Sequence, residues 1–507
     1  MGSLSFAELA CLWGLLSIGL LLRVVALDWG LPPATPEVAA SGIRSSYAID
    51  ENNVLENLAR TDPARFDIDP RFYGWGTLHL ELVLAALEAA QAVGVFETPW
   101  RDAYARMVPG EFEKVYVTGR LVSVFADLVT VFLVFLLGAQ AAGKRAGLWA
   151  AGLVAFAPGH LLQASQIRPD VTATMLVTLV VLLASRWIEA ARPKHWFALG
   201  LAAGLAVSAK YSMALIVGAV LAFVIWKNPR RPVTRWALAG VIVGFLLGEP
   251  FVLTNYAEVA RQVGLFIRSN LATPAEFLIP KPILIAQHLA GLSRFSLGIP
   301  GMVLAVFGLW ALRRSPKEFA LISVALAAGL VSLLPQNWPL MRYHLPLVPL
   351  CAVAAAAGIV ALPRWGGPAA GALALAFALA ASVAQVRFML YPHPANLALA
   401  IVQRAVPPGE TVARIMPETP PLDAALYPMG PNPLMDDLTL NPPPWVITSE
   451  LPIMDYPEAN QRLLNTRYEP IAVVRSQRIF AWATLGESGA PHDWKYTHAS
   501  MTVYRLR

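Results

Sequence analysis

The sequence predicts an all-α polytopic membrane protein, with additional helices outside the bilayer and a small α/β domain at its C-terminal end. Hydrophobic residues make up 56% of the 507 residues and charged residues only 14%, whereas soluble globular domains carry about 25% charged residues. This composition excludes a soluble protein. The two cysteines, Cys11 and Cys351, both lie in apolar segments, so a disulfide framework and a cysteine metal site are excluded as well.

A membrane-spanning helix needs about 20 apolar residues, and about eleven segments come close to that length. The first apolar segment, from Leu12 to Leu27, has no small-residue cleavage site. We therefore expect it to remain as a span and not to be removed as a signal peptide. The expected spans are residues 6–27, 117–138, 146–164, 171–190, 195–209, 212–227, 235–252, 297–312, 318–334, 345–362 and 368–386.

Basic residues indicate how these spans are oriented, because Lys and Arg accumulate in cytoplasmic loops. Alternate short loops hold about thirteen basic residues against two acidic ones, Glu189 and Glu318. The N-terminus is therefore expected in the cytoplasm and the C-terminus outside it. These loops also account for the net charge of +6, so the charge is a topology signal and nucleic acid is not expected as a partner.

Two polar segments are expected on the external side. The first external loop, residues 28–116, has helical spacing of apolar residues at 54–60 and 78–92. These helices are too short or too polar to span the bilayer, so we expect them to lie in its interface. Residues 255–292 have a similar character, because charged residues and a proline interrupt their apolar positions.

From Tyr391 onward, proline and charged residues become frequent and the apolar runs shorten to strand length. We expect a helix at 396–406, ended by Pro407-Pro408-Gly409. Strands are expected at 411–416, 445–447, 471–474, 479–482 and 502–506. The chain is therefore divided into a transmembrane domain, residues 1–390, and an external α/β domain, residues 391–507.

The unusual polar residues of the membrane part collect at the external ends of the spans. Carboxylates and cations near hydrocarbon are costly and are usually kept for function, so one layer that holds both predicts a site for an anionic amphiphile. These residues are Asp50, Glu51, the stretch Asp69 to Gly76, His79, the stretch His160 to Asp170, Lys210, Tyr211, Glu249 and the stretch Arg342 to His344.

Each of these residues also has an ordinary structural explanation. Asp50 and Glu51 suit the start of a short helix, where the helix dipole favours negative charge. Asp170 suits the N-cap of the next span. Lys210 and Arg342 suit the membrane interface as snorkelling side chains. Lone histidines at such positions are usually packed side chains, and tryptophans there are ordinary interface anchors. Position along the chain does not separate these alternatives.

Several short motifs follow one another in a characteristic order. They are the Asp50-Glu51 pair, the stretch Asp69 to Leu78, Gly119-Arg120-Leu121, the stretch Gly143 to Gly147, the stretch Ala157 to His160 leading to Pro169-Asp170, Ala209-Lys210-Tyr211, and the stretch Arg342 to Pro346. In this order they resemble the C-type (GT-C) integral membrane glycosyltransferases, above all the protein O-mannosyltransferases and the lipid A aminoarabinose transferase. The resemblance covers about the first 390 residues and lies in the ordered set, since no single motif is specific.

The resemblance implies a polyprenyl-phosphate sugar donor, an acceptor that is a membrane lipid, a glycan or a protein, and the inner membrane of a bacterial or other prokaryotic cell. By motif match, Asp50 is the catalytic base or orients the acceptor. Asp170 is the acidic residue of the second external loop, and Glu51 is a further catalytic candidate. The donor phosphate would be bound by Lys210, Arg342, Tyr343 and His344. Further candidates for substrate contact are Arg71, Tyr73, His79, His160 and Tyr211.

Two positions depart from the family pattern. Ile49 stands where many relatives have Pro, and Trp75-Gly76 replaces the usual Tyr-Pro. The first change is expected to be harmless. Because of the second change, the role that the family assigns to this position is not carried over to Trp75.

The chemistry of glycosyl transfer fits the assigned residues. Transfer to a hydroxyl group needs a base, and a positioned carboxylate accelerates such a step by about 10²–10⁴-fold. The leaving phosphate is already anionic, so it needs positive charge and no acid. A single displacement inverts the anomeric carbon. The sequence thus predicts an inverting glycosyltransferase that requires no cofactor.

Three alternatives remain. A transporter or flippase for a lipid-linked glycan would place ionisable residues near the midplane and show inverted repeats, and the sequence shows neither. A metal-dependent oligosaccharyl transferase of the same fold would use Asp50 and Asp170 as ligands of a divalent cation. The second external loop lacks the Asp-x-Asp or Glu-x-Asp expected for that site. A non-catalytic relative is disfavoured by the intact Asp50.

Overall fold

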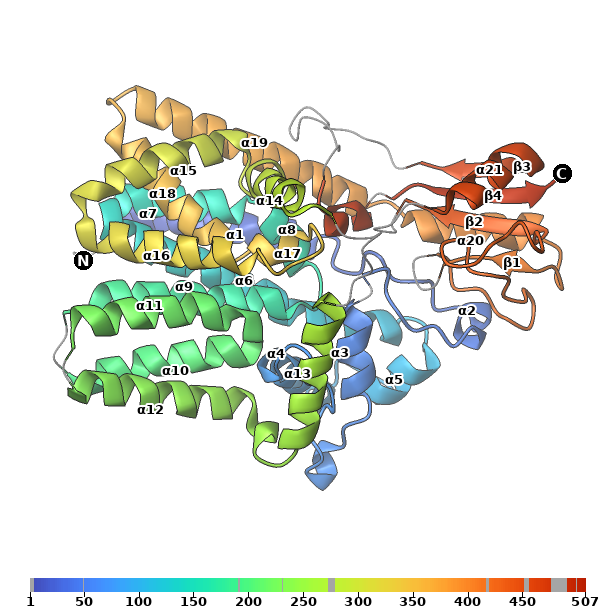
Figure 1. Cartoon of the computed structure of the whole chain (residues 1–507), viewed down its shortest axis with the longest axis horizontal. Helices are drawn as coiled ribbons and strands as arrows, with labels where there is room; N and C mark the ends of the chain where they lie inside the picture. The colour runs from blue at the N-terminus through green and yellow to red at the C-terminus, as the bar shows by residue number, and fades with distance from the viewer. Residues whose placement is uncertain are drawn as a thin grey trace.

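Long apolar helices form a bundle at one end of the molecule, and a small sheet with its own helices lies at the other (Figure 1). The computed structural model describes residues 4–48, 50–189, 192–229, 231–271, 279–415, 419–450, 456–475, 490–497 and 499–507. The helices of the bundle are α1 (Phe6–Val24), α6 (Glu111–Ala142), α7 (Lys144–Ala155), α8 (Pro158–Ala164), α9 (Pro169–Trp187), α10 (Pro193–Ala209), α11 (Ala214–Lys227), α12 (Arg231–Gly248), α15 (Ile299–Ala311), α16 (Pro316–Ser332), α18 (Leu347–Ala361) and α19 (Gly366–Met389).

Several of these helices are apolar enough to cross a membrane. Among the described residues, four helical stretches have the required length and composition: Phe6–Val24, Glu111–Ala142, Pro169–Trp187 and Gly366–Ala405. A fifth results if Lys281–Ser296 and Ile299–Arg314, which are bent by 110°, form one broken span. The shorter apolar helices are Tyr211–Lys227, Val233–Gly248 and Leu347–Ala361. The mainly helical membrane class is thus confirmed, whereas the number of about eleven spans stays a prediction.

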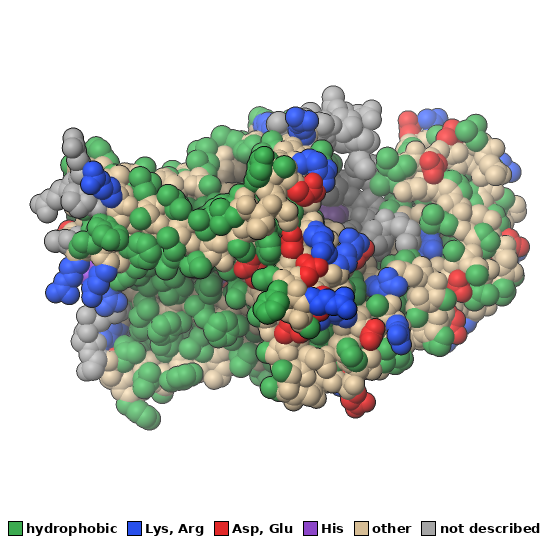
Figure 2. Space-filling view, turned by 90° about the horizontal axis from the view of Figure 1, so that it is seen from below, with side chains coloured by type: hydrophobic (Ala, Val, Ile, Leu, Met, Phe, Trp, Pro, Cys, Tyr) green, Lys and Arg blue, Asp and Glu red, His purple; other side chains and the backbone are tan. Residues whose placement is uncertain are grey.

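Charged side chains are sorted along the long axis of the molecule. Figure 2 shows hydrophobic side chains across the bundle, Lys and Arg at its left end, and charges of both signs over the right half. The loops at the left end include those from α6 to α7 and from α15 to α16, which are the basic loops of the sequence. The opposite end of the bundle carries the sheet and the loops that the sequence predicts to be external.

Helices α10 and α12 pack with their backbones in close contact. A Cβ atom added at Gly200 would lie 2.0 Å from the carbonyl oxygen of Ala237, and one at Gly244 would lie 2.2 Å from that of Leu201. Small residues of this kind let membrane helices approach closely. The C-terminal ends of both helices, followed by Lys210 and Glu249, are therefore held side by side.

The first external loop folds into helices that pack against the bundle. They are α2 (Pro36–Ala40), α3 (Asp50–Leu58), the short turn η1 (Pro63–Arg65), α4 (Leu78–Ala92) and α5 (Trp100–Arg106). The apolar face predicted for α4, with Leu80, Val83 and Leu87, is completely buried against its neighbours. The second external segment forms α13 (Tyr256–Leu271), which lies across the ends of α10 and α12, and α14 (Lys281–Ala290), which runs on into the π-helical turn η5 (Gly291–Ser296).

The C-terminal part contains a four-stranded sheet in the order β1-β2-β4-β3. Its strands are β1 (Val412–Ala413), β2 (Trp445–Ser449), β3 (Tyr468–Val474) and β4 (Met501–Leu506), and its helices are α20 (Pro394–Ala405) and α21 (Glu458–Arg467). Strand β4 pairs antiparallel with β2 and β3, and β1 is parallel to β2. The strand expected at 479–482 lies outside the described residues.

The sheet and the first external loop share one hydrophobic core. Val402 of α20, Trp445 of β2 and Val503 of β4 belong to the same buried cluster as Leu31 and Val38 of the loop. Apolar burial of this kind is the main source of packing free energy. The sheet is therefore held against the loop that carries Asp50.

Candidate active site

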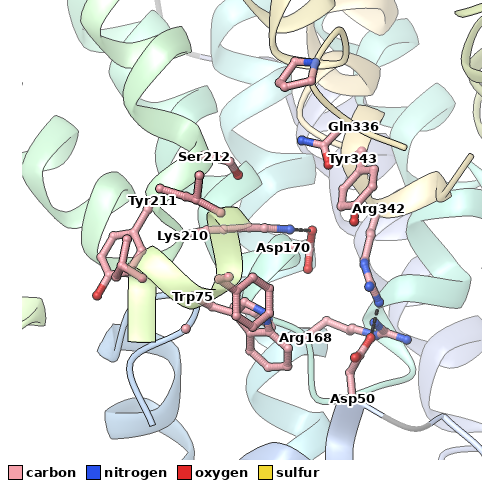
Figure 3. A pocket seen from close by; sticks show the side chains of 16 residues that line it. Asp50, Trp75, Arg168, Asp170, Lys210, Tyr211, Ser212, Gln336, Arg342 and Tyr343 are labelled. Atoms are coloured by element: carbon pink, nitrogen blue, oxygen red, sulfur yellow. Dashed lines mark hydrogen bonds and ion pairs between the residues drawn. The ribbon is translucent and has the colours of Figure 1, made fainter. Parts of the chain in front are cut away.

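A cavity of about 380 Å³ opens where α3, α9, α10, α13 and the turn α17 (Met341–His344) meet. This volume lies in the range of small-molecule sites. Figure 3 shows charged side chains around the cavity, and apolar residues, several of them from α13, form further parts of its lining. Its lining residues are Asp50, Gly74, Trp75, Arg168, Pro169, Asp170, Lys210, Tyr211, Ser212, Val263, Phe266, Ile267, Pro335, Gln336, Arg342 and Tyr343.

Asp50, the first residue of α3, is held by two arginines. Its Oδ2 accepts hydrogen bonds from Arg168, just before α9, and from Arg342 in α17, and both arginines form ion pairs with it. Burial raises the pKa of Asp50, but the two guanidinium groups outweigh burial and lower it from 3.8 to about 2. Asp50 is therefore ionised at neutral pH.

Asp170 and Lys210 form the second ion pair of the cavity. Helix α9 begins at Pro169, so Asp170 lies in its first turn, and Lys210 directly follows α10. Burial lowers the pKa of Lys210, against the opposing effect of Asp170. Nζ of Lys210 also lies 5.4 Å from the ring centroid of Tyr343.

The charges that line the cavity do not balance. Arg168, Lys210 and Arg342 supply three positive charges against the two carboxylates Asp50 and Asp170. In addition, Nη2 of Arg168 is buried and has no hydrogen-bond partner among the described residues. The excess charge and the unused donor both favour an anionic group in the cavity.

The stretch around Trp75 is fixed by its contacts with α10 and α12. The backbone N–H of Tyr211 donates to the carbonyl of Trp75 at 3.0 Å, and the Tyr211 hydroxyl donates to Oε2 of Glu249 at 2.9 Å. Gly76 has a φ of +117°, and a Cβ atom there would lie 2.2 Å from the carbonyl oxygen of Ser208. Only glycine fits at this position, and this is where the sequence departs from the family pattern.

Glu249 is a buried carboxylate beside the cavity wall. Its Oε2 accepts from Tyr211 and from the backbone N–H of Thr77, at 2.9 Å in both cases. Its Oε1 has no hydrogen-bond partner in the described part of the chain. Burial raises the pKa of Glu249 from 4.5 to about 7, and the two hydrogen bonds oppose this shift.

Glu51 lies behind the cavity wall and is completely buried. Arg120 donates to both of its oxygens, at 2.8 and 2.6 Å. The backbone N–H of Ile167, at 2.8 Å, and the hydroxyl of Ser46, at 2.5 Å, complete its partners. Glu51 thus ties the start of α3 to the residue before Arg168.

Three of the predicted histidines are buried outside the lining of the cavity. His344 Nε2 lies 3.0 Å from the Ser296 hydroxyl, and burial lowers the pKa of His344 to about 3. His79 Nδ1 lies 2.9 Å from the Thr172 hydroxyl, and burial lowers the pKa of His79 to about 4. His160 is inside the bundle, 2.5 Å from Asp127.

Arg71 and Tyr73 also lie away from the cavity lining. Arg71 is exposed and forms an ion pair with Asp67 at 2.6 Å. The buried Tyr73 donates its hydroxyl hydrogen to Asp69 at 2.6 Å, and its backbone N–H binds Gln262 of α13. Both residues shape the loop that leads to Trp75.

The structure adds lining residues to which the sequence gave no role. Arg168 stands in the polar run before Asp170, and its place directly before Pro169, at a helix end predicted to be external, was the available signal. Val263, Phe266 and Ile267 come from α13, whose amphipathic spacing predicts an interfacial helix but not its neighbours.

The lining of the cavity contains two carboxylates, Asp50 and Asp170, which are potential ligands of a divalent cation. Among the described residues, no group of three or more His, Cys, Asp and Glu side chains is arranged to hold a metal ion. Asp50 and Asp170 are the carboxylates of the lining, and each already faces a cationic side chain. A divalent cation bound here would need waters or phosphate oxygens of a substrate to complete its oxygen ligands.

Comparisons with known proteins find a family match over part of the sequence and a similar fold among solved structures. Residues 112–253 match the dolichyl-phosphate-mannose-protein mannosyltransferase family. The structure matches ArnT from Cupriavidus metallidurans in the apo state with a TM-score of 0.53 and 12% identity, covering 98% of each chain. No significant match is found among curated protein sequences.

Two further structures are similar at a lower level. ArnT from Cupriavidus metallidurans bound to undecaprenyl phosphate gives a TM-score of 0.49 at 13% identity, covering 97% of each chain. The oligosaccharyltransferase AglB from Archaeoglobus fulgidus also gives 0.49 at 13% identity, covering 84% of this chain and 64% of AglB. The family match and the ArnT fold confirm the resemblance seen in the sequence motifs.

Proposed function

We propose that this chain, which has the ArnT fold and a segment of mannosyltransferase-family sequence, is an inverting glycosyltransferase that uses a polyprenyl-phosphate sugar. The observation that carries the proposal is the cavity itself. It joins an ionised carboxylate, three cations and an apolar wall in one space. A lipid-linked sugar phosphate presents the complementary groups: an anion, a sugar and an isoprenoid chain.

The phosphate of the donor would bind between Lys210, Arg168 and Arg342. These side chains come from the end of α10, the start of α9 and α17, and they converge in Figure 3. Charge-assisted hydrogen bonds to phosphate are the strong ones, and guanidinium groups suit it best. The same contacts would stabilise the negative charge on the polyprenyl phosphate as it leaves.

The lipid part of the donor would lie along the apolar wall. Trp75, Val263, Phe266 and Ile267 line this side, and Phe266 and Ile267 on α13 also remain about half exposed. The helix lies across the ends of α10 and α12, so its apolar residues can extend from the cavity into the membrane interface. An isoprenoid chain would therefore leave the cavity beside α13.

Asp50 would act as the base toward the acceptor hydroxyl. The acceptor oxygen forms a bond to the anomeric carbon, the bond from that carbon to the phosphate oxygen breaks, and Asp50 takes the proton. A carboxylate with a pKa of about 2 is a weak base. The donor phosphate competes for Arg168 and Arg342, however, so donor binding would raise the pKa of Asp50 and strengthen it as a base.

The distribution of basic residues supports an orientation of the chain in the membrane. Lys and Arg side chains gather at the left end of the bundle in Figure 2, whereas α3, α13 and α17, which border the cavity, lie away from that end in Figure 1. If Lys and Arg mark the cytoplasmic side, the cavity and the sheet face outward from a prokaryotic inner membrane and the N-terminus lies in the cytoplasm. The acceptor would then be a lipid, a glycan or a protein on the outer side.

The test is transfer by the purified full-length protein. A panel of radiolabelled polyprenyl-phosphate sugars is incubated with membrane extract, with and without EDTA, and label is followed into lipid, glycan and protein fractions. We expect transfer from at least one donor, loss of transfer in Asp50→Asn, and retention in Glu56→Gln, which changes an exposed residue of the same helix. No transfer from any donor, together with donor movement across proteoliposomes, would establish the transporter alternative. Loss of transfer in EDTA would establish the metal-dependent one.

A further inference from the structure

A short segment of the C-terminal part lies away from the sheet and contacts helices of the N-terminal part. It is the turn η7 (His492–Thr497), which appears in dark red beside α17 in Figure 1. Asp493 in this turn is completely buried. A buried carboxylate is costly unless hydrogen-bond donors surround it, so its partners show what the turn does.

The partners of Asp493 lie on α17 and α8. Its Oδ1 accepts the backbone N–H of Met341 at 2.7 Å, and its Oδ2 accepts that of Arg342 at 3.2 Å. Oδ2 also accepts a hydrogen bond from the side-chain amide of Gln163 at 3.0 Å. Next to it, the backbone N–H of His492 donates to the carbonyl of Pro339 at 3.2 Å. The turn η7 is thus hydrogen-bonded to the backbone of α17 and to that of Pro339, just before this helix.

Apolar contacts hold the same segment in place. Trp494 packs edge-on against Phe295 with ring centroids 5.0 Å apart. Both belong to one buried cluster with Leu162, Met341 and Ala490. Met341, whose backbone binds Asp493, is therefore also fixed through its side chain.

These contacts matter because α17 cannot hold its own geometry. It has only four residues and no side-chain cap of its own, and so short a helix is unstable alone. Its first N–H groups need acceptors from elsewhere, and Asp493 supplies them. Two residues of α17 face the cavity: Arg342 forms an ion pair with Asp50, and the ring of Tyr343 lies 5.4 Å from Nζ of Lys210.

We infer that Asp493 is a positioning residue of the donor-phosphate site, through which the C-terminal segment completes the cavity. It acts by fixing the backbone of Met341 and Arg342, so that Arg342 and Tyr343 face the bound phosphate. The inference rests on the proposed function for the identity of the ligand. The placement of the turn itself rests on the hydrogen bonds alone.

The test compares full-length Asp493→Asn and Asp493→Glu with the wild type. Asparagine has nearly the same size, but its NH₂ group would face the N–H donors that the carboxylate now accepts. Glutamate keeps the charge and reaches further. Glu458→Gln, an exposed residue of α21 in the same part of the chain, is the matched control.

Two readouts separate positioning from simple stability. In transfer assays, Asp493→Asn should raise KM for the donor about tenfold to a hundredfold, with kcat retained and partial rescue in Asp493→Glu. In hydrogen exchange, a peptide that contains Met341 and Arg342 should exchange faster in Asp493→Asn than in the control, while peptides from β2 and β4 keep their protection.

The donor KM is the measurement that decides whether Asp493 positions the donor-phosphate site. Unchanged donor KM overturns the inference, even if exchange is faster, because the turn would then be structural only. A parallel fall of kcat and stability with no change in KM overturns it as well. If the wild type transfers no sugar, the proposed function fails, and undecaprenyl-phosphate binding with the exchange data still decides the positioning role. Should Asp493→Asn fail to fold, the shift in KM of Asp493→Glu decides.

Discussion

Replacing Asp50 with Asn tests the central residue of the candidate site with little change in size. The substitution removes the negative charge that now faces Arg168 and Arg342. The amide of Asn cannot accept a proton from the acceptor hydroxyl, so the sugar-transfer step would proceed without a base. We expect the rate of sugar transfer to fall by about 10²–10⁴-fold.

The same substitution should cost stability, and the pKa of Asp50 gives the magnitude. The pKa is lowered from 3.8 to about 2, which corresponds to about 2 kcal/mol at roughly 1.4 kcal/mol per pKa unit. Because the pKa in the folded state is depressed, this contribution is fully present above about pH 4 and is lost as the pH falls toward 2. The variant should therefore be less stable than the wild type at pH 7, and the difference should shrink below pH 4.

The assay measures initial transfer rates at saturating donor and thermal unfolding in the same detergent between pH 3 and pH 7. Glu56→Gln, on the exposed side of α3, should match the wild type in both measurements. A near-wild-type rate in Asp50→Asn would refute the assignment of the base. A stability difference that stays constant down to pH 3 would refute the charge argument.

The remaining predictions concern neighbouring residues. Glu51→Gln should lower the free energy of unfolding by about 3–5 kcal/mol, because it leaves the buried positive charge of Arg120 without an opposite charge; thermal unfolding measures this, and an unchanged melting temperature would contradict it. Glu249 has a pKa raised to about 7, so the folded protein keeps a proton that the unfolded chain releases, and stability should fall by up to about 3 kcal/mol between pH 4.5 and pH 7. Glu249→Gln should abolish this fall in pH-dependent melting curves. Lys210→Ala should raise the donor KM about tenfold to a hundredfold, whereas Arg106→Ala, at an exposed position, should leave it unchanged.

The gathering of charges at the cavity was predictable because each residue stands at a helix end. Asp50 begins α3, Asp170 lies in the first turn of α9, and Lys210 follows α10. The predicted spans place these helix ends on the same side of the membrane. Residues at these ends are then expected at a similar depth, however the helices pack. A shared layer predicts that these charged residues lie near one another but not which of them form ion pairs. The structure shows that Asp170 pairs with Lys210 and Asp50 with Arg342.

Which of the two adjacent carboxylates, Asp50 or Glu51, faces the cavity was not predictable in this way. Successive residues of a helix point about 100° apart, so only one of two adjacent carboxylates can face a given space. Asp50 faces the cavity, and Glu51 faces Arg120 in the interior. Which of the two turns inward depends on the rotation of α3 about its axis, and the sequence of this short helix does not contain that angle.

The contact of Asp493 with α17 lay further beyond prediction, because 152 residues separate it from Met341. Local patterns determine helices and their ends, but a hydrogen bond across such a distance depends on how the sheet docks on the first external loop. That docking is set by shared burial, since Trp445 and Val503 lie in one core with Leu31. The domain boundary predicted near Tyr391 rests on a change in polarity between residues 1–390 and residues 391–507. The buried carboxylate shows that polarity does not mark where the site ends, because the peptide that carries Arg342 takes its hydrogen bonds from the far side of that boundary.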